Sequence, residues 1–112
     1  MKKLLSLLPV LCLTSTASVA ADIKRGQDIF MKAGCYQCHG TVGQGANTGP
    51  RLAPEPLPLD SFVSFVRNAA ATSMPPYSAN MVSDAEMADI HAYLSSIPKP
   101  PARKDLPLLN NK

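Results

Sequence analysis

The chain has 112 residues, with eleven basic and eight acidic side chains and a formal net charge of +3. This length allows a single small domain, whose core can bury only a limited area of apolar surface. Neither the size of the charge nor its distribution resembles a nucleic-acid-binding face, so we expect no nucleic-acid partner.

Residues 1–21 are typical of a secretory signal peptide that is removed by cleavage. Lys2 and Lys3 supply the positive start, and a short apolar region interrupted by Ser, Thr and Pro follows. Small residues for cleavage occur in two registers, Ser18-Val19-Ala20 and Val19-Ala20-Ala21. The apolar region is too short and too rich in Ser and Thr for a membrane span, which needs about 20 apolar residues. We therefore predict export to the periplasm without stable membrane insertion, an uncleaved anchor being the alternative.

The rest of the chain divides into a domain, residues 22–98, and a Pro-rich C-terminal tail, residues 99–112. The signal peptide removes two basic residues, which leaves nine basic against eight acidic residues and a net charge of +1. The tail is basic and contains the apolar run Leu106-Pro107-Leu108-Leu109, which no predicted helix buries. It is a candidate for docking on a partner in a hetero-oligomer. Folding back over its own domain, or staying disordered, is the alternative.

The first predicted helix covers about Asp22 to Ala33. Ile23, Gly26 and other apolar positions recur along one side at helical spacing. Gly34 follows as a stop signal, so the next residues begin directly after a helix end.

The run Cys35-Tyr36-Gln37-Cys38-His39 has the spacing of a c-type haem attachment site. Two residues between the cysteines put both sulfurs on one side of a tight turn, where they can reach the two vinyl groups of one porphyrin. His39 follows at once and projects its imidazole toward the iron. We therefore predict one haem c, bound covalently through Cys35 and Cys38. An embedded porphyrin also supplies apolar mass that so short a chain lacks.

Other uses of these cysteines fit the sequence less well. A thioredoxin-like redox pair is expected after a strand in a βαβ pattern, which is not apparent here. A structural zinc site usually needs four ligands. The only other cysteine is Cys12, in the predicted signal peptide, and the only other histidine is His91. A chance match in a loop is the third alternative.

The middle of the chain is predicted to be mostly loop around one helix. Residues 41–49 are rich in Gly, Asn and Thr, and alternate prolines then favour an extended stretch. Asp60 or Ser61 can cap a second helix. Met74 precedes two prolines, so it lies on a loop rather than inside a helix.

The last helix is the clearest in the sequence. Ser83-Asp84-Ala85-Glu86 has the capping-box pattern, and Met87, Ile90 and Leu94 form an apolar stripe at spacings of three and four. Pro98 ends the helix. No segment is predicted as a strand, and the fold class is therefore all-α.

From about Asp22 to Pro98 the chain resembles the class I c-type cytochromes of the bacterial periplasm. The features that carry the resemblance, in order, are Gly26 with Phe30, the haem motif Cys35-x-x-Cys38-His39, Gly49-Pro50-x-Leu52, Met74-Pro75-x-Tyr77, Ser83-Asp84-Ala85-Glu86 and Ala92-Tyr93-Leu94. The resemblance implies a small class I cytochrome c fold, with helices packed around one covalently bound haem c. It also implies single-electron transfer rather than enzyme activity.

The resemblance further implies roles for individual residues. His39 is expected as the proximal iron ligand and Met74 as the distal one. The backbone carbonyl of Pro50 is expected to accept a hydrogen bond from the other nitrogen of His39. Gly26 and Phe30 are expected to pack against Tyr93 where the first and last helices cross. One departure is Ala69-Ala70-Ala71, where similar proteins often have a glycine before the methionine segment.

A methionine ligand also suits electron transfer on chemical grounds. A thioether is soft and neutral and raises the reduction potential, and two protein ligands leave no open position on the iron. Met81 is a rival ligand in a loop, and His91 would give a bis-histidine haem. A different class of function, a haem enzyme or gas-binding sensor, requires Met74 to be absent from the iron.

The sequence leaves two settings open for electron transfer. The chain is either a small carrier that diffuses in the periplasm, or the cytochrome subunit of a dehydrogenase complex. In both settings its partners are redox proteins, such as a dehydrogenase, an oxidase or a reductase. The small net charge gives little long-range steering, which favours the subunit, as does the apolar run in the tail.

Overall fold

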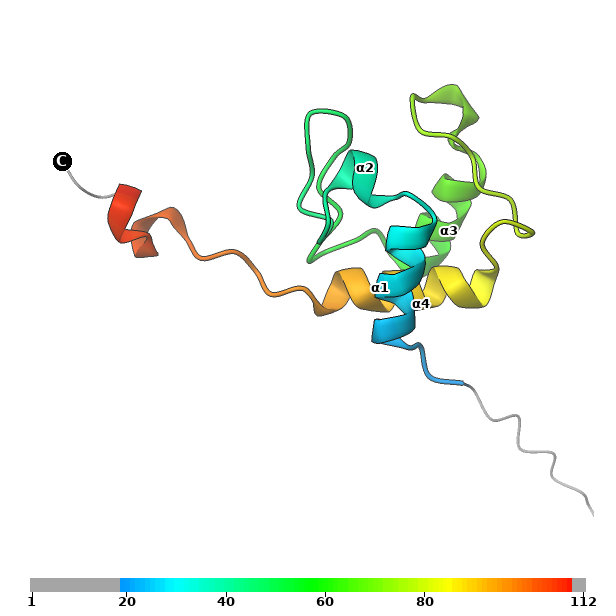
Figure 1. The fold of residues 1–112 in the computed structure, drawn as a ribbon, viewed down its shortest axis with the longest axis horizontal. Helices are drawn as coiled ribbons and strands as arrows, with labels where there is room; N and C mark the ends of the chain where they lie inside the picture. The colour runs from blue at the N-terminus through cyan, green and yellow to red at the C-terminus, as the bar shows by residue number, and fades with distance from the viewer. Residues whose placement is uncertain (1–18, 110–112) are drawn as a thin grey trace, which may run out of the picture.

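The computed structural model describes residues 19–109 and has four α-helices in that range (Figure 1). In chain order they are α1 (Ile23–Lys32), α2 (Tyr36–His39), α3 (Leu59–Arg67) and α4 (Asp84–Ser96), with 3₁₀ turns at Ala69–Ala71, Arg103–Asp105 and Pro107–Leu109. Within residues 19–109 there is no strand, only an isolated bridge between Ala46 and Gly49. The prediction of an all-α class I cytochrome c fold is confirmed.

The predicted signal peptide lies outside the described residues except for its last three positions. Val19 to Ala21 are exposed and precede α1 without helical structure. None of the helices in residues 19–109 has the length and apolar character needed to cross a membrane.

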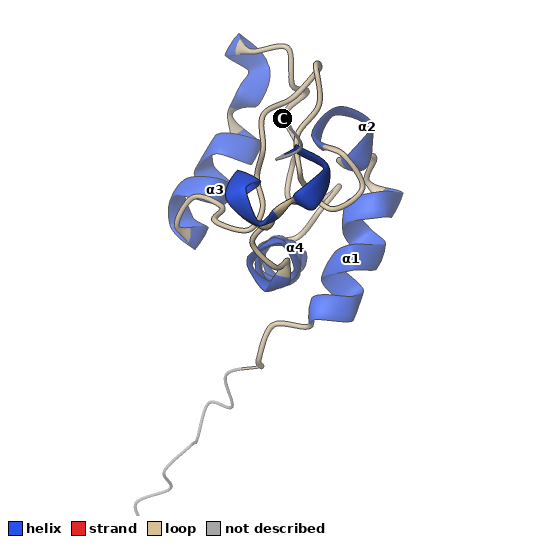
Figure 2. Ribbon diagram, turned by 90° about the vertical axis from the view of Figure 1, so that its left-hand side faces the viewer, coloured by secondary structure: helices blue, strands red, loops and turns tan. Residues whose placement is uncertain are grey.

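The centre of the fold is the crossing of α1 and α4. Figure 2 shows α4 nearly end-on, with α1 on one side and α3 on the other. The backbones meet at Gly26, where an added Cβ would lie 1.9 Å from the carbonyl oxygen of Asp89. Phe30 and Tyr93 pack one turn further along, with ring centroids 5.7 Å apart. The predicted contact between the first and last helices is therefore present, and it depends on a residue without a side chain.

Of the two predicted helix caps, one is present in the structure and the other is not. Ser83 and Glu86 form the predicted capping box at the start of α4, with hydrogen bonds in both directions. The predicted cap of the second helix is wrong, because α3 begins at Leu59 after Pro58 and has no side-chain cap. Proline suits this position because its fixed φ is compatible with helix entry.

The C-terminal tail leaves the domain at the end of α4. Figure 1 shows it running away from the helices toward the C-terminus, in orange to red. Lys99 forms an ion pair with Glu55 at the base of the tail, and both side chains are exposed. Further along, Leu106 is half-buried and Leu108 is 89% exposed. Leu108 is thus not covered by the helical domain.

Candidate functional site

The cysteine pair lies on a one-turn helix directly after α1. The amide of Cys35 donates to the carbonyl of Phe30, so the motif is hydrogen-bonded to the end of α1. The amide of His39 donates in turn to the carbonyl of Cys35, which closes α2. Sequence analysis expected a tight turn here, and the structure has a short helix. Cys35 is half-buried, Cys38 is exposed and His39 is buried, so the three side chains project from one compact unit.

His39 is oriented by the loop that follows α2. Its Nδ1 lies 2.8 Å from the backbone carbonyl oxygen of Pro50. Because a carbonyl oxygen only accepts, Nδ1 carries the hydrogen of this bond, and Nε2 keeps its lone pair. Gly49 lets the loop approach, since a Cβ there would lie 2.6 Å from the carbonyl oxygen of Cys38. The imidazole is therefore fixed in the tautomer that can bind a metal through Nε2.

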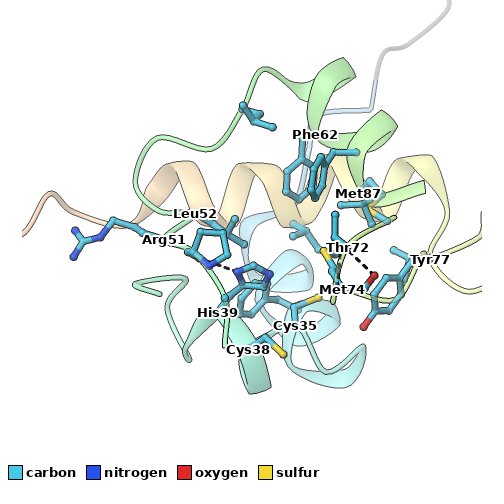
Figure 3. A pocket seen from close by; sticks show the side chains of 18 of the residues that line it. Cys35, Cys38, His39, Arg51, Leu52, Phe62, Thr72, Met74, Tyr77 and Met87 are labelled. Carbon is cyan, nitrogen blue, oxygen red and sulfur yellow. Dashed lines mark hydrogen bonds between the residues drawn. The ribbon is translucent and has the colours of Figure 1, made fainter. Parts of the chain in front are cut away.

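An apolar cavity of about 390 Å³ opens beside this histidine (Figure 3). Its volume lies in the range of about 300–1,000 Å³ that is usual for cofactor sites. The apolar walls come from α1, α3, α4 and the intervening loops, and include Phe30, Leu52, Phe62, Val66, Val82, Met87 and Ile90. Polar lining residues are Thr48, Arg51, Thr72 and Ser73. The cavity therefore suits a flat apolar group with a polar edge.

Met74 lines the same cavity from the loop after α3. The Met74 amide donates a hydrogen bond to the hydroxyl oxygen of Thr72 at 3.1 Å. Figure 3 shows Met74 and His39 reaching the cavity from separate segments, with Cys35 and Cys38 beside His39. The structure thus brings all four predicted side chains to one cavity and adds the Pro50 carbonyl behind His39.

The rival ligands lie elsewhere. Met81 is 65% exposed and does not line the cavity. His91 does not line it either, because its Nε2 donates to the carbonyl of Leu57 at 2.8 Å and its ring packs edge-on against Phe62. The structure therefore offers neither side chain to the cavity.

Sequence reasoning missed several residues of this region. Phe62 and Met87 form part of the cavity wall, although the sequence placed only Met87, and only in the apolar stripe of the last helix. Tyr77, known from the sequence only as part of the Met74-Pro75-x-Tyr77 motif, donates from its hydroxyl to the carbonyl of Ala33 at 2.9 Å. Only the three-dimensional arrangement brings Tyr77 to the end of α1, since the two residues are far apart in sequence.

The protonation of Cys35 bears on the alternative uses of the cysteine pair. Burial raises the pKa of its thiol to about 11, and the neighbouring Cys38 adds to the rise. Redox-active cysteines have lowered pKa values, because the thiolate is the nucleophile. Within residues 19–109, no group of three or more His, Cys, Asp or Glu side chains is arranged to hold a metal ion. The buried, protonated thiol of Cys35 is therefore poorly suited to thiol–disulfide exchange.

The residues present fit a haem c on the chemistry of their donor groups. Two thiols and an imidazole with a free Nε2 lie on one wall, and a thioether lies in the loop that forms another part of the cavity. The remaining walls are apolar, as a porphyrin face requires. No polar group of the cavity conflicts with this cofactor.

Comparisons with known proteins agree with the site. Residues 21–94 match the family described as cytochrome C oxidase, cbb3-type, subunit III. Cytochrome c-552 of Acidithiobacillus ferridurans is 31% identical over 86 residues, which cover 69% of this chain and 37% of that protein. The chain therefore spans little more than a third of the length of this curated relative. No solved structure matches the chain significantly.

The family match covers the structural parts that build the cavity. It begins just before α1, includes the haem motif and the Met74 loop, and ends at Leu94 in α4. Cytochromes c of this kind carry haem c and transfer electrons. The chain belongs to the cbb3-type cytochrome c family and is a monohaem c-type cytochrome.

Proposed function

We propose that this chain carries single electrons in the periplasm by means of a haem c with His39 and Met74 as iron ligands. Cys35 and Cys38 hold the haem by thioether bonds, and residues 1–21 direct export and are removed. When bound, the haem supplies an iron that accepts and releases one electron. The observation that carries this proposal is the cavity itself, lined by an imidazole fixed through Pro50 and by the Met74 thioether.

The chain's own residues support transfer of electrons rather than chemistry on a substrate. The Nδ1–H bond to Pro50 holds the imidazole in one orientation, which keeps the ligand geometry the same in both oxidation states. A thioether favours the reduced iron and raises the potential. With both side chains as ligands, no position remains for a substrate or a gas. The apolar walls exclude water and limit solvent reorganisation.

The ligand assignment is tested by comparing Met74→Leu with Met81→Leu in the haem-loaded protein. We expect Met74→Leu to lose the weak long-wavelength absorption band of methionine-bound ferric haem and to lower the reduction potential. Met81→Leu should retain both, because Met81 is exposed and lies outside the cavity. Persistence of the band in Met74→Leu would overturn the assignment.

The alternative of a gas-binding cytochrome predicts a different result. Rapid binding of carbon monoxide by the unmodified reduced protein would indicate an open distal position and refute electron transfer as the main role. With Met74 on the iron, carbon monoxide should bind rapidly to Met74→Leu and slowly to the unmodified protein.

A second candidate setting is that of a subunit in an oxidoreductase complex. The exposed Leu108 and the basic residues of the tail favour it, because the tail leaves the domain instead of covering it. The matching family is described as an oxidase subunit, which supports a redox protein as the partner of this chain. Docking through the tail then replaces the long-range electrostatic steering that a net charge of +1 does not supply.

Truncation after Pro98 distinguishes the carrier from the subunit. If the tail docks on a partner, the truncated protein keeps its haem spectrum but elutes from a sizing column as a single small domain. The full chain in a native periplasmic extract should elute with a larger protein. Identical elution of both forms at the size of one domain would support the diffusible carrier.

A further inference from the structure

The backbone nitrogen that precedes α1 contacts a buried carboxylate of α4. The amide of Asp22 donates to Oδ1 of Asp89 at 2.7 Å, and Asp89 is 4% exposed. Gly26 meets the backbone of Asp89 one turn later. The contact therefore lies where the two helices cross, and helix packing rather than a flexible side chain holds the nitrogen in place.

The carboxylate of Asp89 has fewer donors than its burial requires. In the part of the chain that the structure describes, Oδ2 makes no hydrogen bond, although Nη1 of Arg25 lies 3.2 Å away as an ion pair. Arg25 is half exposed, and its other nitrogen lies 3.8 Å from Glu86. The charged groups that meet here are Asp22 and Arg25 before and on α1, and Glu86 and Asp89 on α4. Two of these carboxylates, those of Glu86 and Asp89, share the Arg25 guanidinium, and Lys32 acts electrostatically on Glu86 as well. A buried carboxylate such as that of Asp89 needs close pairing.

Asp22 is also the residue after one of the two possible signal cleavage registers. Val19-Ala20-Ala21 has small residues in the pattern that signal peptidases accept. Cleavage after Ala21 hydrolyses the Ala21–Asp22 peptide bond, with water supplying the oxygen of the new Ala21 carboxylate and protons for the released amine. The Asp22 nitrogen then changes from an amide with one N–H to an ammonium with three N–H groups and a positive charge.

We propose that cleavage occurs after Ala21 and that the new α-ammonium of Asp22 forms an ion pair with the buried carboxylate of Asp89. This inference depends on the export that the proposed function includes. The ammonium appears at the atom that already donates to Oδ1, and its additional N–H groups can serve Oδ2. Processing therefore adds a second cation beside Asp89, next to Arg25, without moving α1, and it joins the start of α1 to α4. The unprocessed chain lacks this pair.

The first test is the intact mass of the haem-loaded protein isolated from the periplasm. We expect a chain of 91 residues that begins at Asp22, plus one haem. A chain that begins at Ala21, or one that retains residues 1–21, would overturn the inference. The haem spectrum of the same sample tests the proposed function separately, since haem attachment does not depend on which alanine precedes the cut.

The second test measures the coupling between the ammonium and Asp89 in a double-mutant cycle. One asparagine inserted between Ala21 and Asp22 moves the ammonium outward by one residue but keeps an amide at Asp22. Asparagine does not fit the small-residue pattern before a cleavage site, so the cut should stay after Ala21. Asp89→Asn is made in both backgrounds, with Asp28→Asn as the control because Asp28 is an exposed partner of Lys24. Unfolding constants of the haem-loaded proteins are compared after each amino terminus is verified by mass.

Asp89→Asn should raise the unfolding constant in both chains. We expect the factor in the normal chain to be about five times the factor in the extended chain, or more. Asp28→Asn should have equal effects in both backgrounds. Should Asp89→Asn fail to fold, the extended chain alone should still unfold more readily than the normal one. Equal effects of Asp89→Asn in the two backgrounds, or equal stability of the extended and normal chains, would overturn the ion pair.

Discussion

The two sides of the haem cavity are built in different ways. The helical side consists of α1, α2 and α4, where backbones touch at Gly26 and the tilted rings of Phe30 and Tyr93 pack together. The loop side consists of α3 and the Met74 loop, residues 68–82, which has only a short 3₁₀ turn. Figure 3 shows Met74 and Tyr77 on this side and the cysteines with His39 on the other.

Hydrogen bonds at a few points hold the loop side in place. Nη1 of Arg67 donates to the carbonyl of Tyr77 at 2.8 Å, and the Tyr77 amide donates to the carbonyl of Val66. The Tyr77 hydroxyl reaches across to Ala33 at the end of α1. The helical side is therefore held by contacts between its own helices. The loop side depends on a few hydrogen bonds and on the group that occupies the cavity. A haem attached to one side and bound by Met74 would join the two.

The strongest way to break this arrangement is to prevent haem attachment. An apolar cavity of 390 Å³ that stays empty lowers the free energy of unfolding by at most about 9 kcal/mol, at the cost per unit volume measured for core cavities. That is comparable with the whole stability of a small domain, about 5–15 kcal/mol. We expect the double variant Cys35→Ser/Cys38→Ser to be largely unfolded, as measured by far-ultraviolet circular dichroism.

The single variant Cys38→Ser is the matched control for that experiment. It removes the exposed thiol but leaves the half-buried Cys35 available for one thioether bond. It should retain haem and most of its helical signal. A haem-free double variant with native helicity and cooperative unfolding would show that the cavity does not need its cofactor.

Gly26→Ala tests the helical side alone. Alanine usually stabilises a helix relative to glycine by about 1 kcal/mol. Here the added Cβ would lie 1.9 Å from a backbone oxygen of α4, so the helices must separate. We expect a loss of about 3 kcal/mol in the free energy of unfolding, measured with denaturant. Gln27→Ala, at the exposed neighbouring position of α1, is the control and should be neutral or slightly stabilising. A stabilising Gly26→Ala would contradict the close crossing.

Arg67→Ala tests the loop side. It removes the bond to the Tyr77 carbonyl and the ion pair with Asp84, and the Arg67 side chain is 17% exposed. We expect the free energy of unfolding to fall by about 2 kcal/mol. The methionine band of the ferric haem should also disappear at a lower temperature, because the loop that carries Met74 is released.

Asp84→Asn separates the two interactions of Arg67. It removes the ion pair but keeps the bond to Tyr77, and because Asp84 is 79% exposed its effect should be about 0.5 kcal/mol or less. If Asp84→Asn weakens the methionine band as much as Arg67→Ala, then the ion pair and not the Tyr77 contact anchors the loop.

A smaller effect than that of Arg67→Ala is expected at the cap of α4. Ser83→Ala removes the hydroxyl that accepts from the Glu86 amide, and we expect a loss of about 1 kcal/mol with no change in the methionine band. The Ser83 backbone amide donates to Glu86 and holds the pKa of that carboxyl below its usual value. The stability that this hydrogen bond contributes is fully present above the ordinary Glu pKa, about 4.3. It is lost as the pH falls through the lower pKa that Glu86 has in the folded protein. Ser95→Ala, near the exposed end of the same helix, should change little.

Local patterns were sufficient for the helical side. The apolar spacing and capping box predicted α4, and the stop at Gly34 predicted the end of α1, because helix ends depend on residues within one turn. The cysteine spacing predicted the haem motif, although not that it forms a short helix. The cap of α3 was mispredicted, since Pro58 rather than an acidic or hydroxyl side chain precedes it.

The sequence by itself determined the three longer helices, the haem motif and a short list of methionine and histidine candidates. The tertiary structure decided which of them line the cavity: Met74 does, whereas Met81 is exposed and His91 bonds to Leu57. It also decided that the Asp22 nitrogen meets Asp89, a contact between residues 67 positions apart. The reason is physical: periodicity and spacing act within a few residues, whereas a cavity or a buried carboxylate is made by segments that only packing brings together.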